Sequence, residues 1–370
     1  MQTNSNFFIM RTRNLLLITV LTIIFSTNCF AQIQNFEWQN VQRQYLVRTP
    51  ENYESLPVMF FLHGLGDNIT RLDNEFHFQH VADNYGWMIV IPQALNEGYG
   101  TMWNAGLTAS TTNDSGFLMA LLDSLAVQYP VNQDSIFFTG FSMGGFMSHR
   151  MAIEHGDRIN AAAPVSGLIT SYMANHTAVA PVRILDIHGT TDPVVGYDGG
   201  SEYFGYQLGL SVENILNYWI NANGCTNEPI IDSLPDTQND GLRFIEYVYP
   251  GTKEVRHIKV IGGDHTWYHS DSQYDIGYMD YILDFFTGKL SHDKVTSPTT
   301  GSLNVYPNPT NGQIKIELDM PTAIKVVDIQ GRTMMQKHFD AGLSLIDLQG
   351  IPNGVYFIQG NGIAERIVVE

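Results

Sequence analysis

The sequence predicts an α/β domain with a mostly parallel sheet between layers of helices, followed by a small all-β sandwich. From about Asn35 to Thr287, short apolar segments alternate with amphipathic ones. The later apolar segments are nearly continuous, which is typical of strands covered on both faces. After Gly288, strand-like segments follow one another between Gly and Asn turns. The alternation favours a parallel sheet flanked by helices, and the closely spaced strands favour a sandwich.

The first domain is expected to contain seven strands and four helices. In residues 116–128, leucines and a phenylalanine recur on one helical face, and Pro130 ends the segment. The predicted strands are 42–49, 57–64, 86–93, 135–140, 161–167, 182–189 and 256–263, and the other predicted helices are 143–154, 212–221 and 274–286.

The end of the chain differs in composition from the first domain. Residues 289–301 carry Ser, Thr and Pro without an apolar period, so they are expected to form a linker. Beyond it, Ile314, Ile316 and Leu318 alternate with polar residues, as in a strand. We therefore expect one domain over residues 32–288 and a second over residues 302–370.

The first 31 residues have the order of a secretory signal peptide. Two arginines precede an apolar run at 15–25, and Ala31 supplies a small residue at the cleavage point. The run is too short to span a bilayer stably, so no membrane span is expected in the mature chain. The other interpretation is a buried N-terminal helix. Cleavage removes Cys29, which is less favoured as a lipoprotein cysteine, and leaves Cys225 without a disulfide partner.

The overall charge restricts the classes of partner. The chain of 370 residues has a formal net charge of -18 and is 44% hydrophobic, which is not the composition of a disordered protein. Such a negative charge argues against nucleic acid or an anionic membrane as a partner. It is better suited to solubility outside the cell.

The pattern Gly140-x-Ser142-x-Gly144 fits a nucleophile elbow, in which a strand turns sharply into a helix and exposes a serine hydroxyl. Roughly 0.1 such matches are expected by chance in a chain of this length, so the context decides. Ser142 follows the apolar strand 135–140 and opens a predicted helix. This is the context that an elbow requires.

A serine nucleophile needs an imidazole to take its proton and a carboxylate to orient the imidazole. In α/β hydrolases these residues follow the serine in the order acid, then histidine, each in a loop after a strand. Asp192 follows the strand 182–189, and His265 follows the strand 256–263. Order and position therefore predict a triad of Ser142, Asp192 and His265.

Other residues compete for these roles. Asp186 lies within a strand, and Asp198 lies later in the loop than Asp192. His265 and His269 have i, i+4 spacing, but Gly262 and Gly263 argue against a helix there, so no metal site is expected. No cofactor is expected for this chemistry. The alternative bases are His269, which is the nearest competitor, and His63, His149 and His188.

The tetrahedral intermediate of acyl transfer also needs backbone N–H donors. This fold supplies one donor from the loop after an early strand and one from the residue after the nucleophile. The expected oxyanion-hole donors are the N–H groups of Leu65 and Met143.

Six blocks in order give the first domain a resemblance to a known family. From about Asn35 to Thr287 it resembles the extracellular polyhydroxybutyrate depolymerase and feruloyl esterase group, an α/β-hydrolase family related to carbohydrate esterase family 1. The resemblance implies that Ser142 is the nucleophile, Asp192 the acid and His265 the base, and that the substrate is an ester. The blocks are 60–68, 103–106, 113–152, 187–200, 211–225 and 262–269.

The chain departs from that family beside the predicted base. Asp264 stands where a glycine is common, Tyr268 stands where a proline is common, and cysteines that often pair in the family are mostly missing. These changes fall beside the predicted pocket and therefore bear on the substrate preference. Trp103, Trp267 and Tyr268 are the candidate substrate-binding residues, since the tryptophans could stack on an aromatic acid or a sugar ring, the alternative being that they are core aromatics.

The tail resembles another known element. The stretch "YPNPTNG" and the strand-like segments after it look like the type A C-terminal sorting domain of the type IX, or Por, secretion system. The resemblance implies inner-membrane passage by the signal peptide, recognition by the type IX machinery, export, and removal of the tail, with the enzyme released or attached to the surface. The alternative is a fibronectin-like or carbohydrate-binding module.

The sequence as a whole predicts a secreted serine carboxylesterase that acts on feruloyl or acetyl esters of plant polysaccharide. A depolymerase of poly-3-hydroxybutyrate or a related polyester is the alternative within hydrolases. A non-catalytic glycan-binding surface protein on a hydrolase scaffold is the alternative from another class, and a peptidase of related fold is a third option.

Overall fold

The computed structural model describes two stretches of the chain. It divides the chain into two compact units, Met1–Phe286 and Thr287–Glu370. The predicted signal peptide (1–31) and most of the predicted linker (289–301) lie outside the described residues. The described residues are 33–290 and 305–370, apart from 99, 204, 235, 237, 239, 270–273, 319–321, 329–331, 340–341 and 361–362.

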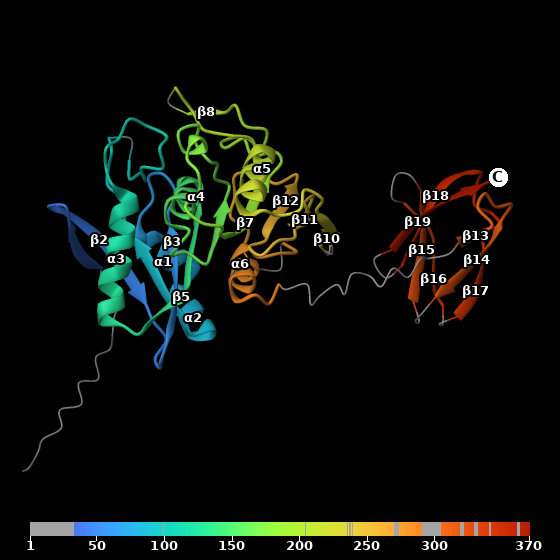
Figure 1. Ribbon diagram of the computed structural model, residues 1–370, viewed down its shortest axis with the longest axis horizontal. Helices are drawn as coiled ribbons and strands as arrows, with labels where there is room; N and C mark the ends of the chain where they lie inside the picture. The colour runs from blue at the N-terminus through green and yellow to red at the C-terminus, as the bar shows by residue number, and fades with distance from the viewer. Residues whose placement is uncertain are drawn as a thin grey trace, which may run out of the picture. The chain divides into compact units, whose positions relative to one another are not determined.

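A ten-stranded sheet forms the centre of the first unit (Figure 1). Its central strands pair in parallel in the order β4-β3-β5-β6-β7-β12. Antiparallel strands complete the sheet on both sides, β2 and β1 beyond β4 and β11 and β10 beyond β12. The predicted α/β-hydrolase class, with a mostly parallel sheet, is confirmed. The bounds are β1 Gln34–Trp38, β2 Val41–Arg48, β3 Leu56–Leu62, β4 Met88–Pro92, β5 Val131–Phe141, β6 Ala161–Val165, β7 Arg183–Gly189, β10 Ile230–Ser233, β11 Arg243–Tyr249 and β12 Val255–Ile261.

Helices cover both faces of this sheet because successive strand residues point to opposite sides. Phe60 stacks on Phe138, with ring centroids 4.6 Å apart, and joins a core that α3, α4 and α5 share. Phe61 points the other way and contacts Phe78 of α2, with ring centroids 5.0 Å apart. The bounds are α1 Ile69–Phe76, α2 Phe78–Tyr85, α3 Asp114–Gln128, α4 Met143–His155, α5 Val212–Asn223 and α6 Tyr278–Thr287, with a 3-10 turn at Met173–Asn175.

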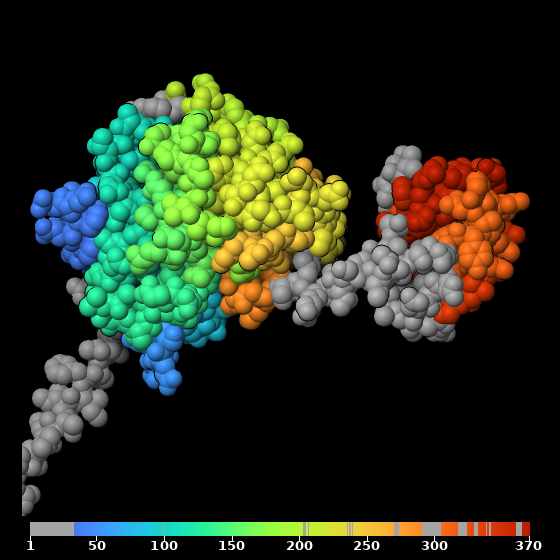
Figure 2. Space-filling view, viewed as in Figure 1, coloured from blue at the N-terminus to red at the C-terminus, as the bar shows by residue number. Residues whose placement is uncertain are grey.

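Each of the seven predicted strands has a counterpart in the sheet, and so do the four predicted helices. Strands β1, β10 and β11 were not predicted, nor were α1 and α2. The first three lie at the antiparallel edges, where a strand is short or only half covered and its apolar signal is weak. A small hairpin, β8 Glu202–Tyr203 with β9 Tyr206–Gln207, lies outside the sheet. The blue turn between β1 and β2 stands out from the body of the unit at one edge (Figure 2).

The second unit is the small all-β module that the sequence predicts. It contains a three-stranded sheet, β13-β14-β17, and a four-stranded sheet, β16-β15-β18-β19, both antiparallel. Its core includes Ile314 and Ile316 of β14, Ile324 of β15 and Ile358 of β18, all fully buried. The bounds are β13 Val305–Tyr306, β14 Gln313–Leu318, β15 Thr322–Asp328, β16 Thr333–Phe339, β17 Gly342–Asp347, β18 Gly354–Gly360 and β19 Ile363–Val369.

Candidate active site

Ser142 lies at the sharp turn between β5 and α4. Its backbone has φ 55° and ψ -119°, a conformation that a residue with a side chain adopts only at a cost of roughly 1–3 kcal/mol. Two hydrogen bonds hold the turn, because Ser142 N donates to Val165 O at 2.9 Å and Phe146 N donates to Ser142 O at 3.0 Å. The geometry is that of the strained elbow that the sequence predicts.

The glycines of the motif are required by packing against β3. A Cβ atom on Gly144 would lie 1.9 Å from Leu62 O, and one on Gly140 would lie 2.5 Å from the same oxygen. Both distances are well below van der Waals contact with a backbone atom that cannot move away. The Gly-x-Ser-x-Gly spacing therefore lets the elbow press directly on the end of β3.

Asp192 and His265 meet because their strands are neighbours. Asp192 follows β7 and His265 follows β12, and these strands pair in parallel. His265 Nδ1 donates to Asp192 Oδ2 at 2.7 Å, while Asp192 Oδ1 accepts hydrogen bonds from the N–H groups of Val194 at 2.9 Å and Val195 at 2.8 Å. Both carboxylate oxygens of Asp192 thus have donors.

These contacts decide the charge of Asp192. Burial of the side chain would raise its pKa, but the hydrogen bonds from His265 and from the Val195 amide outweigh this and hold the pKa below its usual range. A carboxylate that stays ionised keeps the proton of His265 on Nδ1. The other ring nitrogen, Nε2, is then free to accept a proton.

Ser142 and His265 line one cavity of about 280 Å³, named here the ester cavity. The ring of His265 packs on that of Phe141, with centroids 4.7 Å apart. Both predicted oxyanion-hole residues, Leu65 and Met143, also line it. Its wall is completed by Gly64, Asp67, Arg71, Leu107, Phe146, Val194, Val195 and Leu208.

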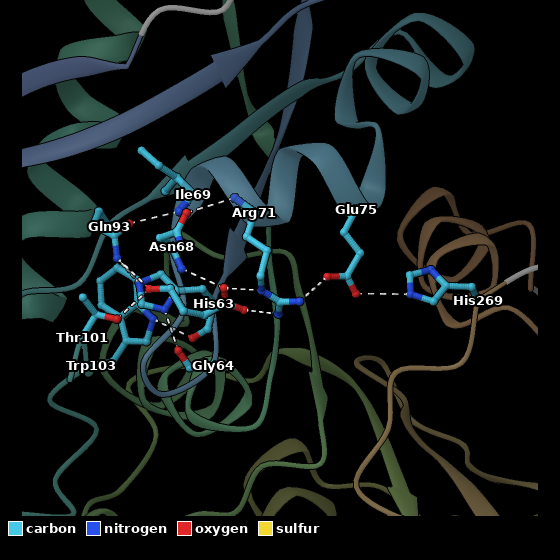
Figure 3. Close-up of polar contacts among 11 residues, drawn as sticks. His63, Gly64, Asn68, Ile69, Arg71, Glu75, Gln93, Thr101, Trp103 and His269 are labelled. Carbon is cyan, nitrogen blue, oxygen red and sulfur yellow. Dashed lines mark hydrogen bonds and ion pairs between the residues drawn. The ribbon is translucent and has the colours of Figure 1, made fainter. Parts of the chain in front are cut away.

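The loop that carries Leu65 is fixed by His63, which sequence reasoning considered only as a rival base. Burial lowers the pKa of His63 to about 4, so the ring is neutral. Its Nδ1 donates to Gly64 O at 2.7 Å (Figure 3). Its Nε2 accepts from Ala94 N at 3.0 Å. The N–H of Met143 is the first of α4 and has no acceptor within the helix.

A row of charged side chains leads outward from the ester cavity. Arg71 forms ion pairs with Asp67 and with Glu75, the latter at 2.6 Å. Glu75 in turn lies 3.4 Å from His269 Nε2, the nearest competitor for the base (Figure 3). His269 therefore has a surface carboxylate as its partner, whereas His265 has Asp192.

The three aromatic residues predicted to bind substrate are buried. Trp103 is 1% exposed, and its Nε1 donates to His63 O at 3.0 Å, beneath the loop of Leu65. Trp267 is 6% exposed among Phe61, Phe76 and Tyr278. Their burial argues against direct contact with substrate and favours the core alternative.

The two departures beside the predicted base contact each other. Tyr268 is 4% exposed, and its hydroxyl donates to Asp264 Oδ1 at 3.1 Å. Burial raises the pKa of Tyr268 to about 12, so this donor keeps its proton. The pair shapes the loop that carries His265 without lining the ester cavity.

The apolar wall of the ester cavity was not predicted. Leu107, Phe146, Val194 and Leu208 come from three loops and one helix. Val194 lies two residues after Asp192, and Phe146 lies four residues after Ser142. This closeness in the sequence is the one signal that could have predicted their place in the wall. Among the described residues, no group of three or more His, Cys, Asp or Glu is placed to hold a metal ion.

Two family models match the chain. Residues 45–208 match the phospholipase/carboxylesterase family, and residues 304–370 match the secretion system C-terminal sorting domain. The first unit is thus an esterase of the α/β-hydrolase class. More particularly, residues 45–208 are similar to phospholipases and carboxylesterases, the unit resembles feruloyl and acetylxylan esterases, and a Por secretion sorting domain follows.

Curated relatives agree with this assignment. The bifunctional acetylxylan esterase/xylanase XynS20E of Neocallimastix patriciarum is 25% identical over 74% of this chain and 37% of its own length. A probable feruloyl esterase C of Aspergillus niger is 26% identical over 60% of this chain and 76% of its own, and feruloyl esterase B of Piromyces equi is 26% identical over 60% and 42%. The chain therefore spans less than half the length of two of these relatives.

A solved structure, the acetyl xylan esterase from Aspergillus awamori, superposes with a TM-score of 0.48 at 15% identity, covering 69% of this chain and 99% of that one.

The sorting domain marks the chain for export through the type IX secretion system to the cell surface or beyond. In the described part of the chain, no helix is both long and apolar enough to cross a membrane.

Proposed function

We propose that the protein is a secreted serine carboxylesterase that cleaves feruloyl or acetyl esters from plant polysaccharide. The observation that carries the proposal is the meeting of three strand-end residues. Ser142 and His265 line one cavity, and Asp192 holds the far side of the His265 ring. The accompanying division of the chain is a signal peptide (1–31), the esterase domain (32–288), a linker (289–301) and the sorting domain (302–370).

The proposed reaction proceeds through an acyl-enzyme. Ser142 Oγ attacks the ester carbonyl carbon while His265 Nε2 takes the hydroxyl proton, and the N–H groups of Leu65 and Met143 stabilise the negative oxygen. Collapse of the intermediate breaks the ester C–O bond, and His265 returns the proton to the leaving alcohol. Water then repeats the sequence, releasing the acid and regenerating Ser142. Asp192 balances the imidazolium charge in both steps.

The lining of the ester cavity supports an acyl group with an apolar body. Leu107, Phe146 and Leu208 offer it hydrocarbon surface, whereas Asp67 and Arg71 make another part of the wall polar. The apolar wall also suits the acyl chain of poly-3-hydroxybutyrate, so a polyester depolymerase is the second candidate. The names of the relatives favour polysaccharide esters.

The decisive variant is Ser142→Ala. Loss of the nucleophile is expected to lower kcat by about 10⁴-fold or more with little change in folding, measured as hydrolysis of methyl ferulate. Ser124→Ala on α3 is the matched control and is expected to keep full activity. A Ser142→Ala protein with full activity would contradict the proposal.

A panel of substrates separates the candidate functions. Methyl ferulate, acetylated xylan and poly-3-hydroxybutyrate granules are incubated with the protein, and release of acid is measured. Clearing of granules without release of ferulate or acetate would favour the polyester depolymerase. A fluorophosphonate probe is expected to label the protein but not Ser142→Ala, and no labelling of either would support a non-catalytic binding protein.

A further inference from the structure

A second cavity, of about 500 Å³, lies next to the ester cavity and is named here the polar cavity. Gly106 and Thr108 line the polar cavity, whereas Leu107 between them lines the ester cavity. The two cavities therefore share the segment 106–108 as part of their walls. The volume lies within the range of roughly 300–1,000 Å³ that is usual for ligand sites. The other lining residues are Asn104, Ala109, Ser110, Thr111, Thr112, Asn113, Arg150 and Tyr172.

Hydroxyl and amide groups dominate the wall of the polar cavity. The hydroxyl oxygens of Thr108 and Ser110 accept backbone N–H groups of the same loop at 3.3 and 3.2 Å, so each hydroxyl keeps its O–H to donate. Asn113 Oδ1 accepts from Gly116 N at the start of α3, which leaves its amide N–H groups as donors. Arg150, the charged residue of the wall, is neutralised by Glu154 at 2.9 Å. A neutral ligand rich in hydroxyl groups matches these partners.

Tyr172 adds an aromatic surface to these polar groups. The residue is 56% exposed, although a Cβ atom on Gly106 would lie only 2.7 Å from its Cδ1. The glycine thus lets part of the ring rest on the loop, and the ring of His176 packs against it with centroids 4.7 Å apart. A pyranose ring has an apolar C–H face and a rim of hydroxyls, and it packs on an aromatic ring while its rim takes hydrogen bonds.

The loop of the polar cavity is held rigidly before any ligand binds. Asn104 Nδ2 donates to Ser110 O at 3.0 Å and to Thr112 O at 2.8 Å, which closes the loop. Arg150 of α4 donates to Asn104 O at 2.6 Å, and Thr170 donates to Ala105 O at 3.2 Å. A loop that is already ordered loses little conformational entropy on binding.

We propose that the polar cavity binds a neutral sugar unit of the polysaccharide next to the one that carries the ester. This rests on the proposed esterase function and assigns the part of the substrate that the ester cavity does not hold. A sugar seated on Tyr172 lies across the Leu107 wall from Ser142. The cavity therefore selects esters attached to a glycan chain over small alkyl esters.

Tyr172→Ala tests this proposal by comparison of two substrates. The variant is expected to raise KM for a feruloylated xylo-oligosaccharide about tenfold and to leave methyl ferulate hydrolysis unchanged. Tyr172→Phe keeps the ring and is expected to stay near the unchanged protein. Tyr53→Ala, which removes another exposed tyrosine, is the matched control. Equal effects of Tyr172→Ala on both substrates would overturn the proposal.

Direct binding separates this inference from the proposed function. The Ser142→Ala protein is titrated by NMR with xylohexaose, cellohexaose and mannohexaose, which carry no ester, and with tetragalacturonate. Binding of at least one neutral oligosaccharide, lost in the double variant with Tyr172→Ala, is the expected result. Binding of no neutral oligosaccharide, or of tetragalacturonate alone, would overturn the inference whether or not the protein hydrolyses esters.

Discussion

Two aspartate–histidine pairs join β7 and β12 of the esterase unit, and they differ in where they lie along these strands. Asp186 and His257 are register partners within the strands, with Asp186 Oδ2 2.8 Å from His257 Nδ1. Asp192 and His265 lie in the loops beyond the strands, 2.7 Å apart. The side chain of His257 is 2% exposed and that of His265 is 16% exposed.

His257 and His265 also differ in what surrounds their second ring nitrogen, Nε2. Nε2 of His257 meets the hydroxyl of Tyr197 at 2.8 Å inside the core, so this imidazole is held at both ends. The ring of His265 is held by Asp192 on one side and lines the ester cavity with Ser142. The same contact therefore lies within the core between the strands, and at their ends it supports the proton transfer proposed for His265.

Asp192→Asn is expected to give the largest effect on activity. An amide cannot hold His265 in the required tautomer or balance the imidazolium charge, so kcat should fall by about 10⁴-fold while the melting temperature changes little. Methyl ferulate hydrolysis and thermal unfolding are the measurements. Asp198→Asn, an exposed residue of the same loop, is the control and should keep its activity.

Asp186→Asn is expected to show the opposite pattern. Asp186 is fully buried, and removal of its charge takes away the carboxylate partner of His257, which should lower the free energy of unfolding by about 3 kcal/mol. The folded fraction should keep kcat within a few fold. Denaturant unfolding and kcat per folded molecule check this, and a large loss of kcat in a stable protein would show that the comparison is wrong.

The smallest effect is a dependence of stability on acid pH. Burial would raise the pKa of Asp186, but His149 and His257 lower it more, so the pKa lies below its usual range. The stability from this depressed pKa is complete above the ordinary aspartate value of about 3.9 and falls as pH drops through the folded value. The difference in melting temperature between the unchanged protein and Asp186→Asn should therefore shrink below about pH 4. A constant difference from pH 7 to pH 3 would contradict it.

The sequence predicts where the central strands end, and the three residues of the proposed triad all lie just after such ends. Ser142, Asp192 and His265 each follow a nearly continuous apolar segment, and such segments form the central parallel strands. The chemistry of α/β hydrolases then supplies the order in which serine, acid and histidine occur. Position relative to a strand favours Asp192 over Asp186 as the acid, and Asp192 is the one that contacts His265.

The sequence does not predict which way side chains point in the loops. Trp103 and Trp267 stand next to predicted site segments, yet both rings turn inward, because a tryptophan buries a large apolar area wherever a core is within reach. The wall of the ester cavity and the whole polar cavity come from loops without periodicity. Their grouping follows from contacts such as that of Asn104 with Ser110, which no spacing rule predicts.

The close approach of Gly144 to Leu62 O limits how far the turn at Ser142 can move relative to β3. It fixes Ser142, the proposed nucleophile, to the strand whose end carries Leu65, so the proposed attacking atom and the proposed oxyanion donors shift together. Leu107 and Val194 lie in loops outside the strands of the sheet. Substitutions at Leu107 and Val194 can therefore change the wall of the ester cavity while Ser142 keeps its place against β3.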